Sequence, residues 1–242
     1  MENRPLLEVF TTSFQESKTI KELIDFYRER IPGCLITVQD NMSTDNTKEI
    51  CEENGVKFIQ FDTNDKMDEK TLIHLRNTSW KNSTAKFIIV CDSDELVDVT
   101  EEDLMFCDKV KTWNVCKCDG VELFGHDEFF KDSFYGVKSE GYSKTILFHK
   151  DSINSMNFAA GSHTCHPTPN EGHSIVYTQY PFKLYHTKWQ NYEEGIKRQN
   201  FIKLRGVSDD SKSKGWNFHY SLPDSEHKKY FDNGFEKRIK IR

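Results

Sequence analysis

The first hundred residues alternate between short apolar runs and segments with helical periodicity. Four runs are predicted strands, at 6–14, 34–41, 56–62 and 86–92. Helical segments separate them, and in the first of these Ile20, Leu23 and Ile24 recur on one helix face. Strands joined through helices form parallel sheets with right-handed crossovers. The pattern therefore predicts an α/β fold, a Rossmann-like, mostly parallel sheet flanked by helices.

Local signals mark the ends of the second and third helical segments. The second is predicted to begin at a cap formed by Ser43, Thr44 or Asp45, whose side chains can accept from orphan helix amides. It is predicted to end at Gly55, a residue that tolerates left-handed backbone. The third helix is predicted over 68–82.

The alternation stops after Leu96. The later segments are predicted as a helix at 100–113, strands at 115–125, 143–150 and 181–189, and a helix at 191–206. These strands indicate a smaller mixed or antiparallel extension of the sheet. Because the sequence shows no repeat and no Pro/Gly-rich linker, one domain over 1–242 is expected, with two functional halves at 1–98 and 99–242.

Polar residues follow three of the four predicted parallel strands, at 11–13, 40–41 and 92–95. Carboxyl ends of parallel strands meet at one edge, where such sheets bind ligands. Asp92 and Asp94 are one residue apart, so their carboxylates share one side of the chain if the extended geometry continues. Two convergent carboxylates attract a hard cation such as Mg2+ or Mn2+. The implied ligand is a nucleotide or diphosphate, although a solvated acidic turn is the simpler alternative for such a cluster.

Composition narrows the class of protein. With 242 residues, of which 36% are hydrophobic and 13% aromatic, the chain is long and apolar enough for a substantial core. The net charge of -6 argues against a general nucleic-acid binder, because no excess of cations is available for a phosphate backbone. The sequence shows no signal-peptide or membrane-spanning pattern. A soluble, cytoplasmic protein is expected, and peripheral association with a membrane stays open.

Three segments resemble a known family when taken together. TTSFQE, VQDNMSTDNT and LRNTSWKNSTAKFIIVCDSDE stand in the order and spacing typical of family 2-like glycosyltransferases of GT-A fold, whose motifs look like DNGSTDGT, ARN-G and DxD. The resemblance covers about residues 6–98. A looser similarity places His186 of LYHTKWQNYEEGIKRQ at the histidine of an H-Y-x-x-R-S-x-E stretch. The resemblance implies a metal-dependent enzyme that moves a sugar from a nucleoside diphosphate sugar, with UDP favoured, to a hydroxyl of a glycan or glycoconjugate.

The resemblance also implies roles for particular residues. It assigns nucleotide-sugar binding to the half at 1–98, and acceptor binding and catalysis to the half at 99–242. Mn2+ or Mg2+ would be held directly by Asp94, with Asp92 and His186 completing the site. The residues implied in nucleotide-sugar binding are Thr11, Thr12, Asp40, Asn41, Arg76, Asn77, Asp92, Ser93 and Lys188. Arg76 would face a phosphate, and Glu95 would either support the site or cap the following turn.

The catalytic base is the least defined part of the prediction. An inverting transfer, which is the favoured course, needs a general base within reach of the acceptor hydroxyl. Asp127, Glu128 and Glu171 are the acidic candidates in the second half, and His163 in a Gly-Ser-His turn is a further one. The sequence departs from the family here, because it has no clear acid pair of the ED type.

Two other functions are compatible with the same pattern. A sugar nucleotidyltransferase shares the nucleotide-binding sheet and the acidic metal site, but such enzymes usually begin with a Gly-rich phosphate loop. VFTTSFQES contains no glycine, which counts against that class. The other alternative is a non-catalytic carbohydrate-binding protein on the same fold.

Overall fold

The computed structural model describes residues 4–126, 134–179 and 181–241. Up to Asp92, strands and helices alternate as the sequence predicts. These elements are β1 (Leu7–Ser13), α1 (Ser17–Arg30), β2 (Leu35–Asp40), α2 (Thr47–Glu53), β3 (Lys57–Gln60), α3 (Glu69–Thr78) and β4 (Phe87–Asp92).

The four strands β1 to β4 form the parallel part of the sheet, in the order β4-β1-β2-β3. Val9 of β1 and Ile89 of β4 are fully buried, because helices or strands cover both faces of the sheet at this point. The register places Thr12 beside Asp92, and the carbonyl of Ser13 accepts the amide of Asn41 at 2.9 Å. The polar strand ends therefore converge on one edge, as predicted.

Two helix boundaries in the first half of the chain differ from the prediction. Helix α2 begins after Asn46, and Asp45 accepts the amide of Thr47 at 3.1 Å without being the cap residue itself. Helix α3 ends at Thr78, four residues earlier than predicted, and a 3-10 turn follows. The tighter turn brings Trp80 into the core, where its ring packs edge-on against Phe148 with centroids 4.8 Å apart.

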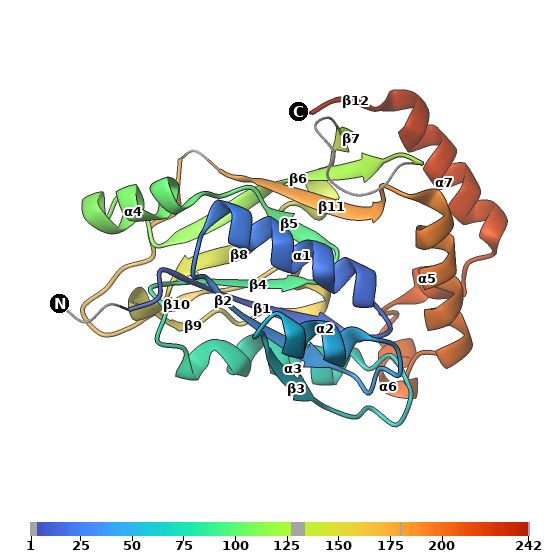
Figure 1. The fold of residues 1–242 in the computed structure, drawn as a ribbon, viewed down its shortest axis with the longest axis horizontal. Coiled ribbons are helices and arrows are strands. Elements are labelled where there is room, and N and C mark those ends of the chain that lie inside the picture. Colours follow the sequence, from blue (N-terminus) through green and yellow to red (C-terminus); the bar gives the residue numbers. More distant parts are fainter. Residues whose placement is uncertain (1–3, 127–133, 180, 242) are drawn as a thin grey trace.

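The second half extends the sheet beyond β4. Its elements are β5 (Glu95–Val97), α4 (Glu101–Val110), β6 (Val115–Phe124), β7 (Tyr135–Lys138), β8 (Lys144–His149), β9 (Ile153–Ser155), β10 (Thr168–Pro169), β11 (Lys183–Trp189), α5 (Tyr192–Arg205), α6 (Asp209–Ser213), α7 (Asp224–Lys237) and β12 (Ile239–Lys240). Strands β8, β6, β7 and β12 continue the sheet with antiparallel pairing, while β11 lies parallel to β6 and antiparallel to β5 (Figure 1). The predicted fold class, with its mixed extension, is confirmed.

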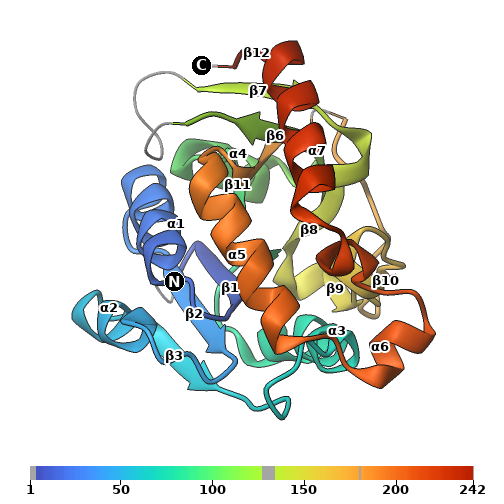
Figure 2. The ribbon, with the colours of Figure 1, turned by 90° about the vertical axis from the view of Figure 1, so that its right-hand side faces the viewer.

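Helices α5, α6 and α7 gather at one end of the sheet, as Figures 1 and 2 show. An apolar cluster of Phe124, Trp189 and Phe231 holds α7 against β6 and β11. Short α6 meets α3, where Ser211 accepts the amide of Glu69 at 3.0 Å. The C-terminal helices thus form a wall beside the strand ends.

No helix in the described part of the chain is long and apolar enough to cross a membrane.

Gly120 sets how closely the segment that carries Tyr142 can approach β6. A Cβ at this position would lie 2.5 Å from the carbonyl oxygen of Ser139 and 2.5 Å from the carbonyl carbon of Tyr142. Both atoms belong to backbone, so the segment itself must shift. We expect Gly120→Ala to lower the free energy of unfolding by about 1–3 kcal/mol, as overpacking does, measured by urea unfolding. Gly141→Ala is the matched control, because its Cβ would meet only a side-chain oxygen at 3.8 Å. Equal unfolding midpoints for the two variants would contradict this account.

Candidate functional site

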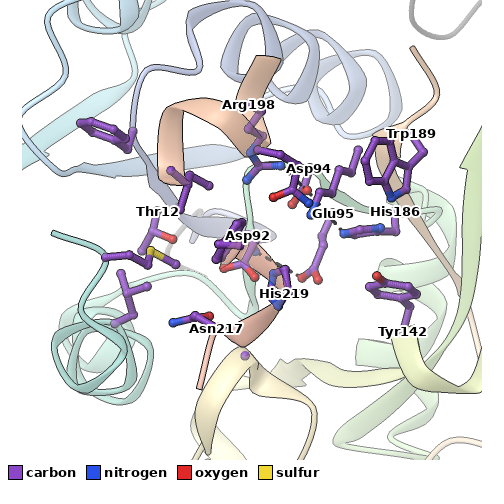
Figure 3. A pocket seen from close by; sticks show the side chains of 18 of the residues that line it. Thr12, Asp92, Asp94, Glu95, Tyr142, His186, Trp189, Arg198, Asn217 and His219 are labelled. Atoms are coloured by element: carbon purple, nitrogen blue, oxygen red, sulfur yellow. Dashed lines mark hydrogen bonds and ion pairs between the residues drawn. The ribbon is translucent and has the colours of Figure 1, made fainter. Parts of the chain in front are cut away.

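A cavity of about 840 Å³ lies where the strand ends face the C-terminal helices. Thr12 and Asp92 reach it from the ends of β1 and β4, and Arg198 and Tyr230 line it from α5 and α7. Figure 3 shows the three acidic side chains at 92, 94 and 95 close together in this pocket. Both halves of the chain therefore contribute walls to one site.

Asp92 ends β4 and is the most exposed of the three acids, at 27% of its side chain. Its Oδ1 accepts from Arg76 at 2.8 Å, and its Oδ2 lies 3.7 Å from the ammonium of Lys144. Burial alone would raise the pKa of Asp92, but the charges of Arg76 and Lys144 outweigh it and lower the pKa to about 2. Asp92 is therefore a carboxylate at neutral pH.

Asp94 lies in a turn and not in continuing strand, which corrects the extended geometry expected across 92–94. The Asp94 carbonyl accepts the amide of Thr187 at 2.8 Å, which connects the turn to β11. Its carboxylate forms an ion pair with Arg198 and lies 3.4 Å from Nε2 of His186. Burial opposes ionisation, yet these two cations hold the pKa of Asp94 well below its usual range.

His186 is enclosed by two carboxylates and an aromatic ring. Its Nε2 faces Asp94, and its Nδ1 lies 3.5 Å from Oε1 of Glu122. The ring of Tyr142 stacks on it, with centroids 4.1 Å apart (Figure 3). Burial would lower the pKa of His186, but Asp94 and Glu122 together raise it to about 9. The side chain is thus held in one orientation at the cavity wall.

Several charged residues of the site were missed by the sequence analysis. Lys144 of β8 forms an ion pair with Glu95, whose Oε2 also accepts the amide of Asp92 at 3.2 Å. Glu95 therefore supports the turn at residues 92–95, called the acidic turn below. This is one of the two roles that were predicted for Glu95. Arg198 of α5 bridges Asp94 to Glu16. Burial raises the pKa of Glu16 to about 7, against the opposing charge of Arg198. The periodicity of a single segment carries no signal for such pairs, because their partners are distant in sequence.

The loop that carries His163 is fastened to helix α3. The amide of Gly161 donates to Glu69 at 2.8 Å, and Asn77 exchanges hydrogen bonds with the backbone of Phe158 at 2.8 and 3.0 Å. His163 lines the cavity beyond these anchors. Partial burial, and then the charge of Lys144, lower the pKa of His163 below its usual value. The ring is therefore neutral at pH 7.

The structure brings eight of the predicted site residues together. Those that line the cavity are Thr12, Asn41, Arg76, Asp92, Asp94, His163, His186 and Lys188. Arg76, which was predicted to face a phosphate, is 3% exposed. Its guanidinium forms ion pairs with Glu69 and Asp92 at 2.7 and 2.8 Å. Arg76 lines the cavity and, through Asp92, also supports the turn at residues 92–95.

The other predicted residues lie outside this lining, as far as the chain is described. Thr11 is buried within β1, and Asp40 accepts the amide and hydroxyl of Ser43 at 2.7 and 2.6 Å. Asn77 holds the His163 loop, Ser93 donates to Glu16, and Glu171 lies in an exposed turn. Asp127 and Glu128 fall outside the described residues.

The resemblance implies a divalent ion, which needs oxygen or nitrogen ligands from the cavity wall. In residues 4–126, 134–179 and 181–241, no group of three or more His, Cys, Asp or Glu side chains is placed to hold a metal ion. However, Mg2+-type ions are usually bound by one or two protein groups and completed by water and substrate phosphate. Asp94 and His186 fit that role, because their ligating atoms are 3.4 Å apart and a carboxylate backs the other ring nitrogen, as behind metal-bound histidines.

Three comparisons place the chain among known proteins. No curated protein matches the sequence significantly. Among solved structures, S. aureus TarS 1-349 in complex with UDP is similar at 15% identity and TM-score 0.43, over 83% of this chain and 65% of that one. A mannosyltransferase from Pyrobaculum calidifontis, in complex with GDP-Man and Mn2+, is similar at 18% identity and TM-score 0.34, over 48% and 36% of the two chains.

Glucosyl-3-phosphoglycerate synthase from Mycobacterium tuberculosis, in complex with Mn2+, UDP and glucosyl-3-phosphoglycerate, is similar at 16% identity and TM-score 0.34, over 49% of this chain and 44% of that one. The chain thus spans less than two thirds of the length of each of these three solved chains. Residues 8–104 match the family model described as Glycosyl transferase family 2. This match confirms the predicted resemblance to family 2 glycosyltransferases over residues 8–104.

Proposed function

We propose that this protein transfers a sugar from a nucleoside diphosphate sugar, with a UDP-sugar favoured, to a hydroxyl of a glycan or glycoconjugate, using Mn2+ or Mg2+. One observation carries the proposal: Asp92 and Asp94, at the end of the family-matched segment, share a cavity with His186 and Arg198 from the second half. A cavity of about 840 Å³ lies within the range of about 300–1,000 Å³ that is typical of small-molecule and cofactor sites. Residues 1–98 would bind the donor, and 99–242 would bind the acceptor and supply catalysis.

The donor would lie along the polar strand ends. Thr12 and Asn41 line the part of the cavity near β1 and β2, where the base and ribose would bind. Asp94 and His186 would hold the divalent ion, with Asp92 close by, and the ion would neutralise charge on the diphosphate leaving group. Arg198 contacts the same carboxylate and would have to yield part of this contact for Asp94 to hold the ion. Arg198 and Lys188 would then face the departing diphosphate as fixed cations.

The acceptor would enter from the side of α7. Tyr142 and Tyr230 line that part of the cavity and are not buried, so their rings can contact a sugar. His163 is the candidate base that lies in the cavity, and its ring is neutral at pH 7. A neutral imidazole nitrogen can take the proton of an acceptor hydroxyl as it attacks the anomeric carbon. This assignment corresponds to an inverting transfer.

The activity is tested by incubating the protein with Mn2+ and a panel of nucleotide sugars, with a mixture of glycan acceptors. We expect release of nucleoside diphosphate that depends on acceptor and is lost when EDTA removes the metal. Release of pyrophosphate would instead indicate a sugar nucleotidyltransferase. Binding of glycans without any release of nucleotide would indicate a carbohydrate-binding protein.

The role of His163 makes a separate prediction. We expect His163→Gln to lower turnover by about 100-fold or more, as loss of a general base does, while donor affinity measured by calorimetry stays the same. His166→Gln is the matched control, because His166 is exposed on the same loop and lies outside the cavity lining. If both variants keep wild-type turnover, another group is the base.

A further inference from the structure

Glu122 and His186 are adjacent across two strands of the second half. They are register partners in the parallel pair of β6 and β11, so both side chains project from the same face of the sheet. Glu122 is 3% exposed and His186 is 6% exposed. Their Oε1 and Nδ1 atoms face each other at 3.5 Å. The sheet therefore fixes a carboxylate directly behind the imidazole that lines the cavity.

These two atoms have no other hydrogen-bond partner in the part of the chain that the structure describes. A buried polar atom left without a partner costs free energy of about 1–3 kcal/mol. Both atoms are satisfied at once only if Nδ1 carries a proton and donates it to Oε1. In the ion-free protein Nε2 also carries a proton, which it directs at Asp94, and an ion bound there would replace that proton while Nδ1 keeps its own.

Helix α7 determines which oxygen of Glu122 is available. The hydroxyl of Tyr230 donates to Oε2 of Glu122, which leaves Oε1 for the histidine. The ring of Tyr142 stacks on the face of the imidazole, with an angle of 18° between the two ring planes. Tyr142 thereby limits rotation of the ring, and Tyr230 limits rotation of the carboxylate. Successive side-chain contacts, Tyr230 to Glu122, Glu122 to His186 and His186 to Asp94, thus lead from α7 to the turn at residues 92–95.

We propose that Glu122 is a positioning residue that holds His186 in the tautomer and orientation needed to ligate the divalent ion, with Tyr230 of α7 fixing Glu122 in turn. This inference rests on the proposed function, since it concerns the ion that accompanies the nucleotide. The proposal gives helix α7 a role in metal binding, and α7 lies outside the family match at 8–104. Partners of this kind typically contribute about 10- to 100-fold to metal affinity.

The test measures Mn2+ affinity in the presence of UDP, from the electron paramagnetic resonance signal of free Mn2+. Glu122→Gln is expected to bind Mn2+ about 10- to 100-fold more weakly than the wild type, with UDP affinity in EDTA unchanged. Glu8→Gln is the matched control, because Glu8 is another buried strand glutamate, bonded to Thr37 and Ser83 away from the cavity. We expect its Mn2+ affinity to equal that of the wild type.

A double-mutant cycle separates positioning from a general effect on folding. If Glu122 acts through His186, Glu122→Gln adds no further loss of Mn2+ affinity in a His186→Gln background. Additive losses would overturn the proposal. Should Glu122→Gln fail to fold, Tyr230→Phe removes a single hydroxyl and is expected to weaken Mn2+ in the same direction.

The proposed function and this inference fail in different ways. A wild type that binds UDP identically with and without Mn2+ would refute the metal-dependent function, and the inference with it. A wild type that binds Mn2+ with UDP, alongside a Glu122→Gln variant of equal affinity, would refute the inference alone.

Discussion

Replacing Asp94 by asparagine is expected to abolish Mn2+-dependent binding of the donor nucleotide. The substitution keeps the shape of the side chain but removes the negative charge that faces His186 and Arg198. A direct ligand should matter more than the about 10- to 100-fold carried by residues behind a ligand, so we expect a loss of donor affinity greater than about 100-fold. Calorimetric titration of UDP in Mn2+ and in EDTA measures it.

Metal-independent binding provides the internal reference for this prediction. In EDTA, Asp94→Asn and the wild type are expected to bind UDP alike, because the polar strand ends remain in place. Asp108→Asn is the matched control, since Asp108 is a partly buried aspartate of α4 that pairs with Lys86 outside the cavity. An Asp94→Asn variant that keeps the Mn2+ effect on UDP affinity would remove Asp94 from the proposed metal site.

The sheet edge was predictable from sequence because its causes are local. An apolar run such as 87–90 predicts a strand by itself, and alternation with helices fixes the parallel direction of neighbouring strands. Once direction is fixed, Thr12 and Asp92 must meet at the same edge, and the register confirms this. Three polar strand ends at one edge are then sufficient to locate the cavity.

The cations of the site were not predictable in the same way. Lys144 is the second residue of the predicted strand at 143–150, and its pattern does not distinguish it from an exposed lysine. Only the antiparallel pairing of β8 with β4 brings it to Glu95. Arg198 stands in a charged helical segment, where its pairing with Glu16 depends on how α5 docks. Such contacts follow from tertiary packing, which overrides the local expectation for a charged side chain.

Arg76 shows how the location of a residue can be predicted when its protein contacts cannot. Its place before the acidic turn was predicted, but its guanidinium is directed at Glu69 and Asp92. Glu69 lies seven residues earlier on the same helix, two turns away on the same face. That spacing was available in the sequence. It becomes informative only once α3 is known to press this face against the end of β4.

The buried pair makes the largest stability prediction. Glu69 is 2% exposed, and its Oε1 accepts from Arg76 at 2.7 Å and from the amide of Gly161 at 2.8 Å. Arg76→Leu removes the cation but leaves Glu69 buried and Asp92 dependent on Lys144 alone. Because an uncompensated buried charge is strongly unfavourable, we expect the free energy of unfolding to fall by about 3–5 kcal/mol, measured by urea unfolding at pH 7.

A second substitution tells whether charge or packing causes the loss. Arg76→Leu combined with Glu69→Gln removes the stranded charge while the amide oxygen can still accept from Gly161, so the double variant should be more stable than Arg76→Leu alone. Lys21→Leu is the control for an exposed pair, because Lys21 meets Asp25 on the surface of α1 and should cost no more than about 0.5 kcal/mol. If the double variant is no more stable than the single one, lost packing around Arg76 explains the effect. The acidic turn would then depend on the shape of this side chain and not on its charge.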